Sequence, residues 1–226
     1  MIALMAMAAP RQSSLPGLNN SSVPWTIVFA LTLLTLLPAI ILSMTPMVRL
    51  LVVFHFLRQA LGTQTAPGNQ VLMGLALVMT WFLMQPVLLD VEHQAVEPFQ
   101  QGKISGWEAI ERGSGPPKLY MLHYAREKDL ALFVSAAQSG RPARPEDLPL
   151  RVVVPAYMLS ELKAGFEIGA VLFLPFLLVD MVVASITTSI GMYQLPPVVI
   201  STPLKILLFV MADGWHLLVG SLLKSF

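Results

Sequence analysis

Cysteine is absent from the 226 residues, and charged side chains are scarce. The absence of cysteine excludes disulfides and thiolate metal sites. Charged residues make up 12% of the chain and hydrophobic ones 55%, with a mean hydropathy of +0.70, whereas a soluble domain carries roughly 25% charged residues. This composition predicts a membrane protein. The net charge of +1, with no basic stripe, gives no electrostatic basis for binding nucleic acid.

Most of the charges are confined to one part of the chain. Residues 90–151, which we call the polar island, hold 17 of the 27 charged side chains. The island divides the sequence into a lead at 1–20, a hydrophobic helical hairpin at 21–89, the island itself, and a C-terminal hydrophobic helical region at 152–226. The lead is a possible signal-peptide remnant.

Long apolar runs lie on both sides of the island. About 20 apolar residues in a helix are enough to cross the ~30 Å core of a bilayer, and a proline inside such a run, as at Pro38, predicts a kink. The expected fold is an all-α membrane protein with about four long kinked hydrophobic helices, amphipathic helices and a polar helical insertion. The predicted helical segments are residues 25–44, 47–61, 71–89, 152–169, 168–190 and 204–223.

Two local patterns refine this outline. Within the island, glycine and proline predict breaks at 113–117 and 139–149, on either side of a helix near 119–137. Between the first two spans, Arg49 and Arg58 occur without acidic neighbours. Because short cytoplasmic connections are enriched in Lys and Arg, we expect this connection in the cytoplasm and the island on the opposite side of the membrane.

Ionisable side chains interrupt the apolar runs of the C-terminal region, where an unpaired charge costs several kcal/mol. Lys163 and Glu167 are four residues apart and can pair on one helix face. Lys205 and Asp213 are separated by ~12 Å along a helix, so each needs a partner elsewhere. Either these groups pair between helices or subunits and fix assembly, or Asp180 or Asp213 serves an ion or proton relay. The full set is Glu161, Lys163, Glu167, Asp180, Lys205 and Asp213.

The residue patterns of catalysis are missing. The sequence has no His-Glu-x-x-His, no Gly-x-Ser-x-Gly and no phosphate loop. We therefore expect neither enzyme activity nor a bound metal or cofactor. Gly165 and Gly169 form a small-xxx-small motif, which allows two helices to approach closely.

Six stretches in order carry a resemblance: residues 58–71, 155–169, 175–180, 200–205, 209–215 and 220–226. Together they resemble the FliP family of flagellar export-gate proteins, which is related to the R component of injectisome type III secretion systems. The stretch at 58–71 and the polar lead look more flagellar than injectisome. The injectisome R subunit stays open as an alternative, as does an ion or small-molecule transporter that uses Asp180 or Asp213.

The resemblance implies a channel-forming role without enzyme activity. Several copies would assemble with FliQ-like and FliR-like subunits, and with FlhB-like and FlhA-like export components, into a helical multi-subunit channel. That channel would pass unfolded flagellar proteins across the bacterial inner membrane at the flagellar basal body, in contact with membrane lipid. The same resemblance places the polar island on the periplasmic side.

The resemblance also points to a pore constriction. Family members often carry three consecutive methionines before a Leu-x-Pro turn, forming a pliable ring that seals the closed pore. The matching positions here are Met192, Tyr193 and Gln194, with a single methionine. We expect these three residues to line the constriction, with the Tyr193 ring supplying the missing bulk.

Overall fold

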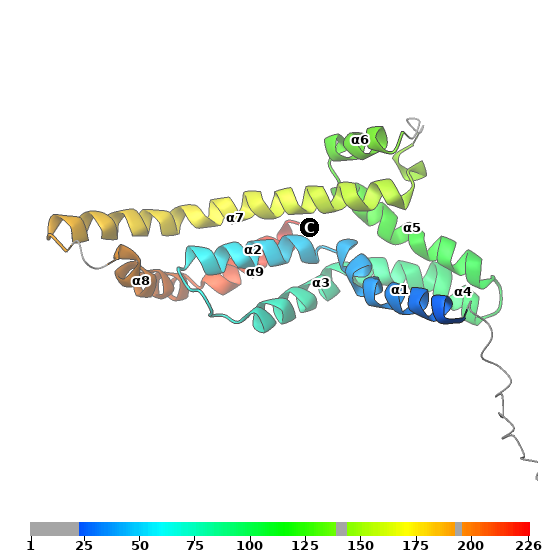
Figure 1. The fold of residues 1–226 in the computed structure, drawn as a ribbon, viewed down its shortest axis with the longest axis horizontal. Coiled ribbons are helices and arrows are strands. Elements are labelled where there is room, and N and C mark those ends of the chain that lie inside the picture. Colours follow the sequence, from blue (N-terminus) through cyan, green and yellow to red (C-terminus); the bar gives the residue numbers. More distant parts are fainter. Residues whose placement is uncertain (1–22, 139–143, 193–195) are drawn as a thin grey trace, which may run out of the picture. The chain divides into compact units, whose positions relative to one another are not determined.

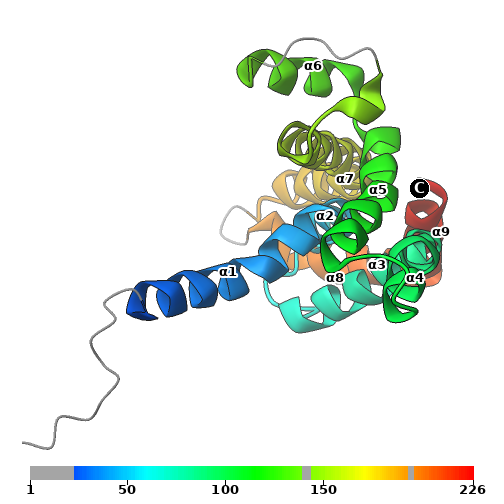
Figure 2. The same cartoon turned by 90° about the vertical axis from the view of Figure 1, so that its right-hand side faces the viewer.

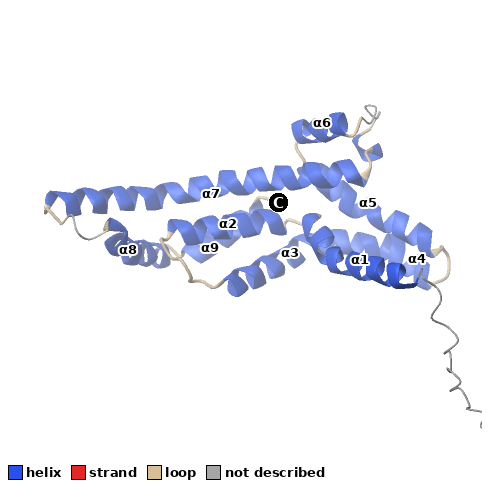
Figure 3. Ribbon diagram, in the orientation of Figure 1, coloured by secondary structure: helices blue, strands red, loops and turns tan. Residues whose placement is uncertain are grey.

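The computed structural model describes residues 23–138, 144–192 and 196–226. All secondary structure of these residues is helical, which confirms the predicted all-α class (Figure 1, Figure 3). The lead at 1–20, and with it the possible signal-peptide remnant, lies outside the described residues. The helices of the N-terminal hairpin and island are α1 Val23–Ser43, α2 Met47–Ala60, α3 Asn69–Val91, η1 Glu92–Val96, α4 Glu97–Gln100, α5 Gly106–Tyr124, α6 Glu127–Ala136 and η2 Pro145–Asp147. Those of the C-terminal region are α7 Leu150–Ser189, α8 Pro197–Met211 and α9 Gly214–Lys224.

The chain divides into two compact units, residues 1–39 and residues 40–226. The described part of the first unit is the apolar helix α1, which carries no charge and contains Pro38 within the helix. Its aromatic side chains Trp25 and Phe29 are exposed. Such a surface is stable in lipid or against other apolar helices.

The core of the second unit lies where α2 packs along α7 (Figure 1). Leu50, Val53, Phe54 and Leu57 repeat at intervals of three or four residues and are fully or almost fully buried. This spacing places them on one face of α2. Burying each such side chain contributes about 1.5–3 kcal/mol, so this face anchors the helices that carry the charged groups.

The C-terminal region differs from the prediction in its segmentation. Residues 150–189 form the single 40-residue helix α7, about 60 Å long, where we predicted two segments. Pro155 and Pro175 lie inside it without ending it. The predicted segment 204–223 is instead divided between α8 and α9, which are bent by 66°. Asp213 at this bend has a left-handed backbone, φ 50°, followed by Gly214, and this conformation cannot continue an α-helix.

The described part of the island is helical, and one of its two predicted breaks is wrong. The other, at 139–149, falls between α6 and α7 and lies partly outside the described residues. Helix α5 runs through Gly113 to Pro117, where the sequence predicted an interruption, and the chain breaks instead at Ala125. Packing explains the difference. A Cβ at Gly113 would lie 3.3 Å from the Cβ of Ala95 in the π-helical segment η1, so this glycine permits close contact between the two helices. Pro116 is buried in the same region.

Two helices of the described residues are long and apolar enough to cross a membrane, Asn69–Gln100 and α7, or three if α8 and α9 form one bent span. We predicted about four. The predicted segment 25–44 does not reach the length of a span in the described residues. Residues Ile27–Ile40 form a shorter apolar helix within α1.

Candidate functional site

A fully buried ion pair joins α2 to α7. The Arg49 Nε donates a hydrogen bond of 2.9 Å to Glu161 Oε2, and its Nη2 donates to Glu161 Oε1. Arg49 is 6% exposed and Glu161 0%. This fork geometry is the strongest arrangement of a guanidinium and a carboxylate. It also offsets the desolvation cost that both charges incur in an apolar core.

Arg49 also binds the C-terminal end of the described chain. Its Nη1 donates to the Ser225 backbone oxygen at 3.0 Å, and its Cζ lies 3.8 Å from the centre of the Phe226 ring. From α5, the Tyr124 hydroxyl donates to the backbone oxygen of Phe226. The Arg49 Cζ also lies 5.8 Å from the centre of the Tyr124 ring. The guanidinium on α2 therefore contacts α5, α7 and the residues after α9, and we call this set the Arg49 hub.

The sequence analysis placed Arg49 between the first two spans and used its charge to orient the chain in the membrane. The residue is buried inside α2, so its charge belongs to the core and gives no information on membrane orientation. A lone cation within an apolar run was the signal available in the sequence. Its partner could not be identified, because Glu161 lies 112 residues further along the chain.

A second ion pair joins α7 to α8. The Lys205 Nζ donates to Asp180 Oδ2 at 2.5 Å, and the Ser201 hydroxyl donates to Asp180 Oδ1 at 2.6 Å. Lys205 is 2% exposed, whereas the Asp180 side chain is 33% exposed. The partner that Lys205 requires is therefore in the same chain. We call this set the Asp180 tie.

The remaining charges of the C-terminal region are exposed, and they differ in whether they form an ion pair. Lys163 and Glu167 pair along the surface of α7, with Nζ and Oε1 2.8 Å apart, and both are well exposed. Surface pairs of this kind contribute about 0–1 kcal/mol. Asp213 lies exposed at the bend between α8 and α9, and within the described part of the chain its carboxylate has no salt-bridge partner.

The two glycines of the small-xxx-small motif face α2. A Cβ at Gly165 would lie 3.0 Å from Val52, and one at Gly169 would lie 2.5 Å from the Phe56 ring. The second distance is shorter than any ordinary carbon contact. The motif therefore brings α7 close to α2 within one chain, directly beside the Arg49 hub.

The island is attached to α7 through a polar cluster that the sequence analysis missed. The Ser160 hydroxyl donates to Asp129 Oδ2 at 2.5 Å, and the Arg126 Nε donates to the same oxygen at 2.7 Å. Burial raises the pKa of Asp129, but these two donors outweigh it and hold the pKa below its ordinary value. Figure 2 shows α6, which carries Asp129, beside α7.

Aromatic residues of α5 lie next to the Arg49 hub. The Tyr120 and Tyr124 rings are 4.8 Å apart between centres, and Tyr120 lies 6.3 Å from Tyr157 of α7. Burial raises the pKa of the Tyr120 hydroxyl above its ordinary range, so it stays protonated. These rings fasten α5 to α7 mainly by apolar contact.

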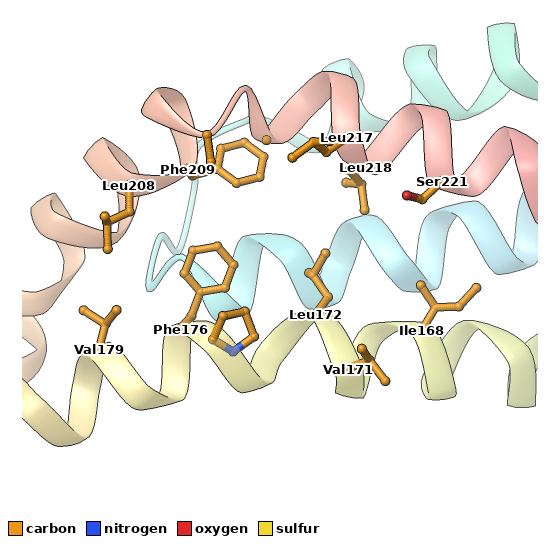
Figure 4. Close-up of a pocket in the computed structure, with 13 residues that line it drawn as sticks. Ile168, Val171, Leu172, Phe176, Val179, Leu208, Phe209, Leu217, Leu218 and Ser221 are labelled. Carbon is orange, nitrogen blue, oxygen red and sulfur yellow. The ribbon is translucent and has the colours of Figure 1, made fainter.

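An apolar groove of about 410 Å³ separates α7 from α8 and α9. Phe176 of α7 and Phe209 of α8 point into it from opposite sides, with ring centres 6.3 Å apart (Figure 4). Ser221 contributes the polar oxygen seen at its edge (Figure 4). Such a lining supplies no acid or base that could activate the Ser221 hydroxyl for catalysis. Within the described ranges, no three acidic or histidine side chains are grouped to hold a metal ion.

The predicted constriction is described only in part. Met192 follows Gly191, whose φ is 78°, and is 39% exposed at the end of α7. Its backbone N–H donates to the Thr187 oxygen at 3.0 Å. Tyr193 and Gln194 lie outside the described residues.

The described residues form helices alone, and two of these helices are long and apolar enough to cross a membrane, which is the architecture of a helical membrane protein. The family model described as "FliP family" matches residues 30–222, and the chain belongs to the FliP family. It is 47% identical over 234 residues to the flagellar biosynthetic protein FliP of Pectobacterium carotovorum subsp. carotovorum, covering 100% of this chain and 91% of that protein. It is 46% identical over 208 residues to the flagellar biosynthetic protein FliP of Bacillus subtilis (strain 168), covering 92% and 94% of the two chains.

Proposed function

We propose that this chain is a channel-forming subunit of the flagellar type III protein export gate in the bacterial inner membrane. It acts without enzyme activity, as several copies together with FliQ-like, FliR-like, FlhB-like and FlhA-like components, and the assembly passes unfolded flagellar proteins. The observation that carries the proposal is membership of the FliP family over residues 30–222. The names of the relatives favour the flagellar system over the injectisome.

The distribution of apolar surface supports an assembled state. Large hydrophobic side chains are exposed on the helices of the C-terminal region, among them Leu178, Met181, Val199 and Met211. Exposed apolar surface of this extent is typical of interaction with lipid or other subunits. Asp213, at the α8–α9 bend, then provides a charge for a cation of a neighbouring subunit.

The gate itself is assigned to Met192, Tyr193 and Gln194. Glycine at 191 supports the left-handed turn that ends α7, and the thioether of Met192 is a flexible side chain suited to sealing around varied cargo. Replacing Met192 and Tyr193 together by Ala should raise ion leakage through the resting complex without reducing its recovery. If the variant complex conducts ions no better than the parent complex, Met192 and Tyr193 do not form the seal.

The polar island is assigned to the periplasmic side. Cysteine scanning tests this cleanly because the chain has no native cysteine. Ser135→Cys in α6 should react with a membrane-impermeant thiol reagent once the outer membrane is permeable. Gln64→Cys in the turn between α2 and α3 is the matched control and should react only after the inner membrane is opened. The reverse pattern would overturn the orientation.

The test of the function as a whole is the composition of the complex. Extraction in mild detergent should give a particle whose mass corresponds to several copies of this chain with further export subunits. A self-sufficient transporter would instead run as this chain alone and lose proton flux on Asp213→Asn. That result would replace the export-gate proposal.

A further inference from the structure

The last turn of α2 carries Arg58, a cation with no carboxylate partner among the described residues. The first acidic residue of the sequence is Asp90, so no carboxylate precedes α3 or lies within its first 21 residues. Arg58, in the last turn of α2, donates to the side-chain oxygen of Asn69, and its Nη2 lies 3.4 Å from His55 Nδ1. Neither partner carries a negative charge, and a guanidinium has five N–H donors. Arg58 therefore retains both its charge and free donors.

The same residues line a small pocket. Its volume is about 190 Å³, and its polar lining comes from His55, Arg58 and Asn69. Small-molecule sites typically measure roughly 300–1,000 Å³, so this pocket admits a compact group. The amino end of α3 lies beside it, and Gly68 leaves the first N–H groups of that helix without a side-chain cap. Such N–H groups and the helix dipole favour an anion, and phosphate in particular.

The other half of the pocket is apolar. Leu51, Leu72 and Met73 complete the lining, and Val71 and Met73 expose most of their surface next to it. This end of α3 is also one end of the candidate membrane span Asn69–Gln100. Headgroups of a bilayer lie where such a span begins, and the acyl chains lie along it.

We propose that this pocket binds the phosphate of an anionic phospholipid, with the guanidinium of Arg58 and the amino end of α3 as the anion site. The acyl chains pack along Val71 and Met73. Asn69 holds the guanidinium toward the helix end, so the planar fork of Arg58 is oriented before the lipid binds. A carboxylate from a neighbouring protein would neutralise the charge of Arg58 but would not cover the apolar side chains of Val71 and Met73. One phospholipid molecule does both, through its phosphate and its acyl chains.

The experiment titrates the delipidated complex, extracted in mild detergent, with phosphatidylglycerol and counts bound lipid by native mass spectrometry. Arg58→Gln should weaken phosphatidylglycerol binding about fivefold, which corresponds to the loss of one basic contact near an anionic headgroup. Arg58→Lys, which keeps the charge and guards against misfolding, should weaken it less. Arg112→Gln is the matched control, because Arg112 is paired with Glu108 on the polar face of α5, and it should bind as the parent does.

Two further titrations separate the possible sources of the anion. Phosphatidylcholine should bind more weakly than phosphatidylglycerol and be insensitive to Arg58→Gln, and inorganic phosphate at millimolar concentration should not displace the lipid. Displacement by inorganic phosphate would overturn the lipid assignment in favour of free phosphate. Equal phosphatidylglycerol binding by parent and Arg58→Gln would overturn the site. Loss of a protein subunit from Arg58→Gln, with no lipid bound to the parent, would assign Arg58 to a protein carboxylate instead.

Discussion

The Arg49 hub and the Asp180 tie are both ion pairs of α7, but they differ in burial and geometry. At the hub, two hydrogen bonds join Arg49 to a fully buried Glu161, and two further segments, α5 and the residues after α9, contact the guanidinium. At the tie, the point charge of Lys205 meets an Asp180 that keeps a third of its side chain exposed. The hub lies in the core beside α2, and the tie lies toward the turn that carries Met192.

This difference separates a fixed part of the molecule from an adjustable one. A bidentate pair in a dry core has one low-energy arrangement, whereas a partly solvated lysine–aspartate pair can exchange protein contacts for water. An export gate of the kind we propose must hold its subunits in place and still open at one end. We therefore assign rigidity to the hub and movement to the end of α7 beyond Asp180.

The largest effect is expected at the hub. Replacing Glu161 by Gln leaves the Arg49 charge buried without a counter-charge, which costs about 3–5 kcal/mol. Recovery of the complex from membranes should fall severely. Combining Arg49→Met with Glu161→Leu, which removes both charges, should restore part of the recovery. Equal recovery of Glu161→Gln and the parent would remove the hub from the folding core.

A smaller effect is expected at the tie. Asp180→Asn keeps the shape of the side chain but removes its charge, and a hydrogen bond to a charged group contributes about 1.5–3 kcal/mol. The complex should form, with a lower thermal midpoint and greater leakage than the parent. If its midpoint fell as far as that of Glu161→Gln, the two pairs would be equivalent and the comparison would fail.

The close approach of α7 to α2 sharpens the comparison. Gly169→Ala introduces a methyl group 2.5 Å from the Phe56 ring, and forcing such a group into a packed interface costs about 1–3 kcal/mol. Gly74→Ala in α3 is the matched control, because no atom lies within 4 Å of its Cβ position. Thermal melting of the two variants should show loss for the first and no loss for the second. Matching melting curves would argue against tight packing at Gly169.

The smallest effect concerns the attachment of the island. The pKa of Asp129 is lower in the folded chain than its ordinary value of 3.8, so its contribution is complete above that value and is lost as the pH falls through the lower folded value. Hydrogen exchange of α6 should therefore accelerate as the pH is lowered from 5 toward 3, after correction for the intrinsic rate. Asp129→Asn should flatten that dependence, and an unchanged dependence would exclude Asp129 as its source.

Local sequence patterns predicted much of the helical content. Apolar runs of membrane length indicated the helices around residues 25–44 and 71–89, because hydropathy over about 20 residues is a strong signal. The spacing of Gly165 and Gly169 indicated a close helix approach, which the structure places against α2. These features depend on neighbours in the sequence, and such neighbours are visible without a structure.

Features that depend on distant residues were not predictable in the same way. Helix α5 continues through two prolines, and its Gly113 lies close to Ala95 of η1, a contact that no local pattern indicates. Glu161 was identified as a charge that needs a partner, but a single sequence does not connect it with Arg49. The break between α8 and α9 was missed although the Asp213–Gly214 dipeptide is a local turn signal, because the apolar run continues on both sides of it.

Hydrogen–deuterium exchange along α7 in the assembled complex tests the rigid hub and the adjustable end most directly. Both regions belong to one helix, so each serves as the reference for the other. Amides around Glu161 should exchange at least about tenfold more slowly than those between Asp180 and Ser189, which corresponds to a difference of about 1.4 kcal/mol in local opening. Equal exchange along the helix, or faster exchange around Glu161, would contradict the account.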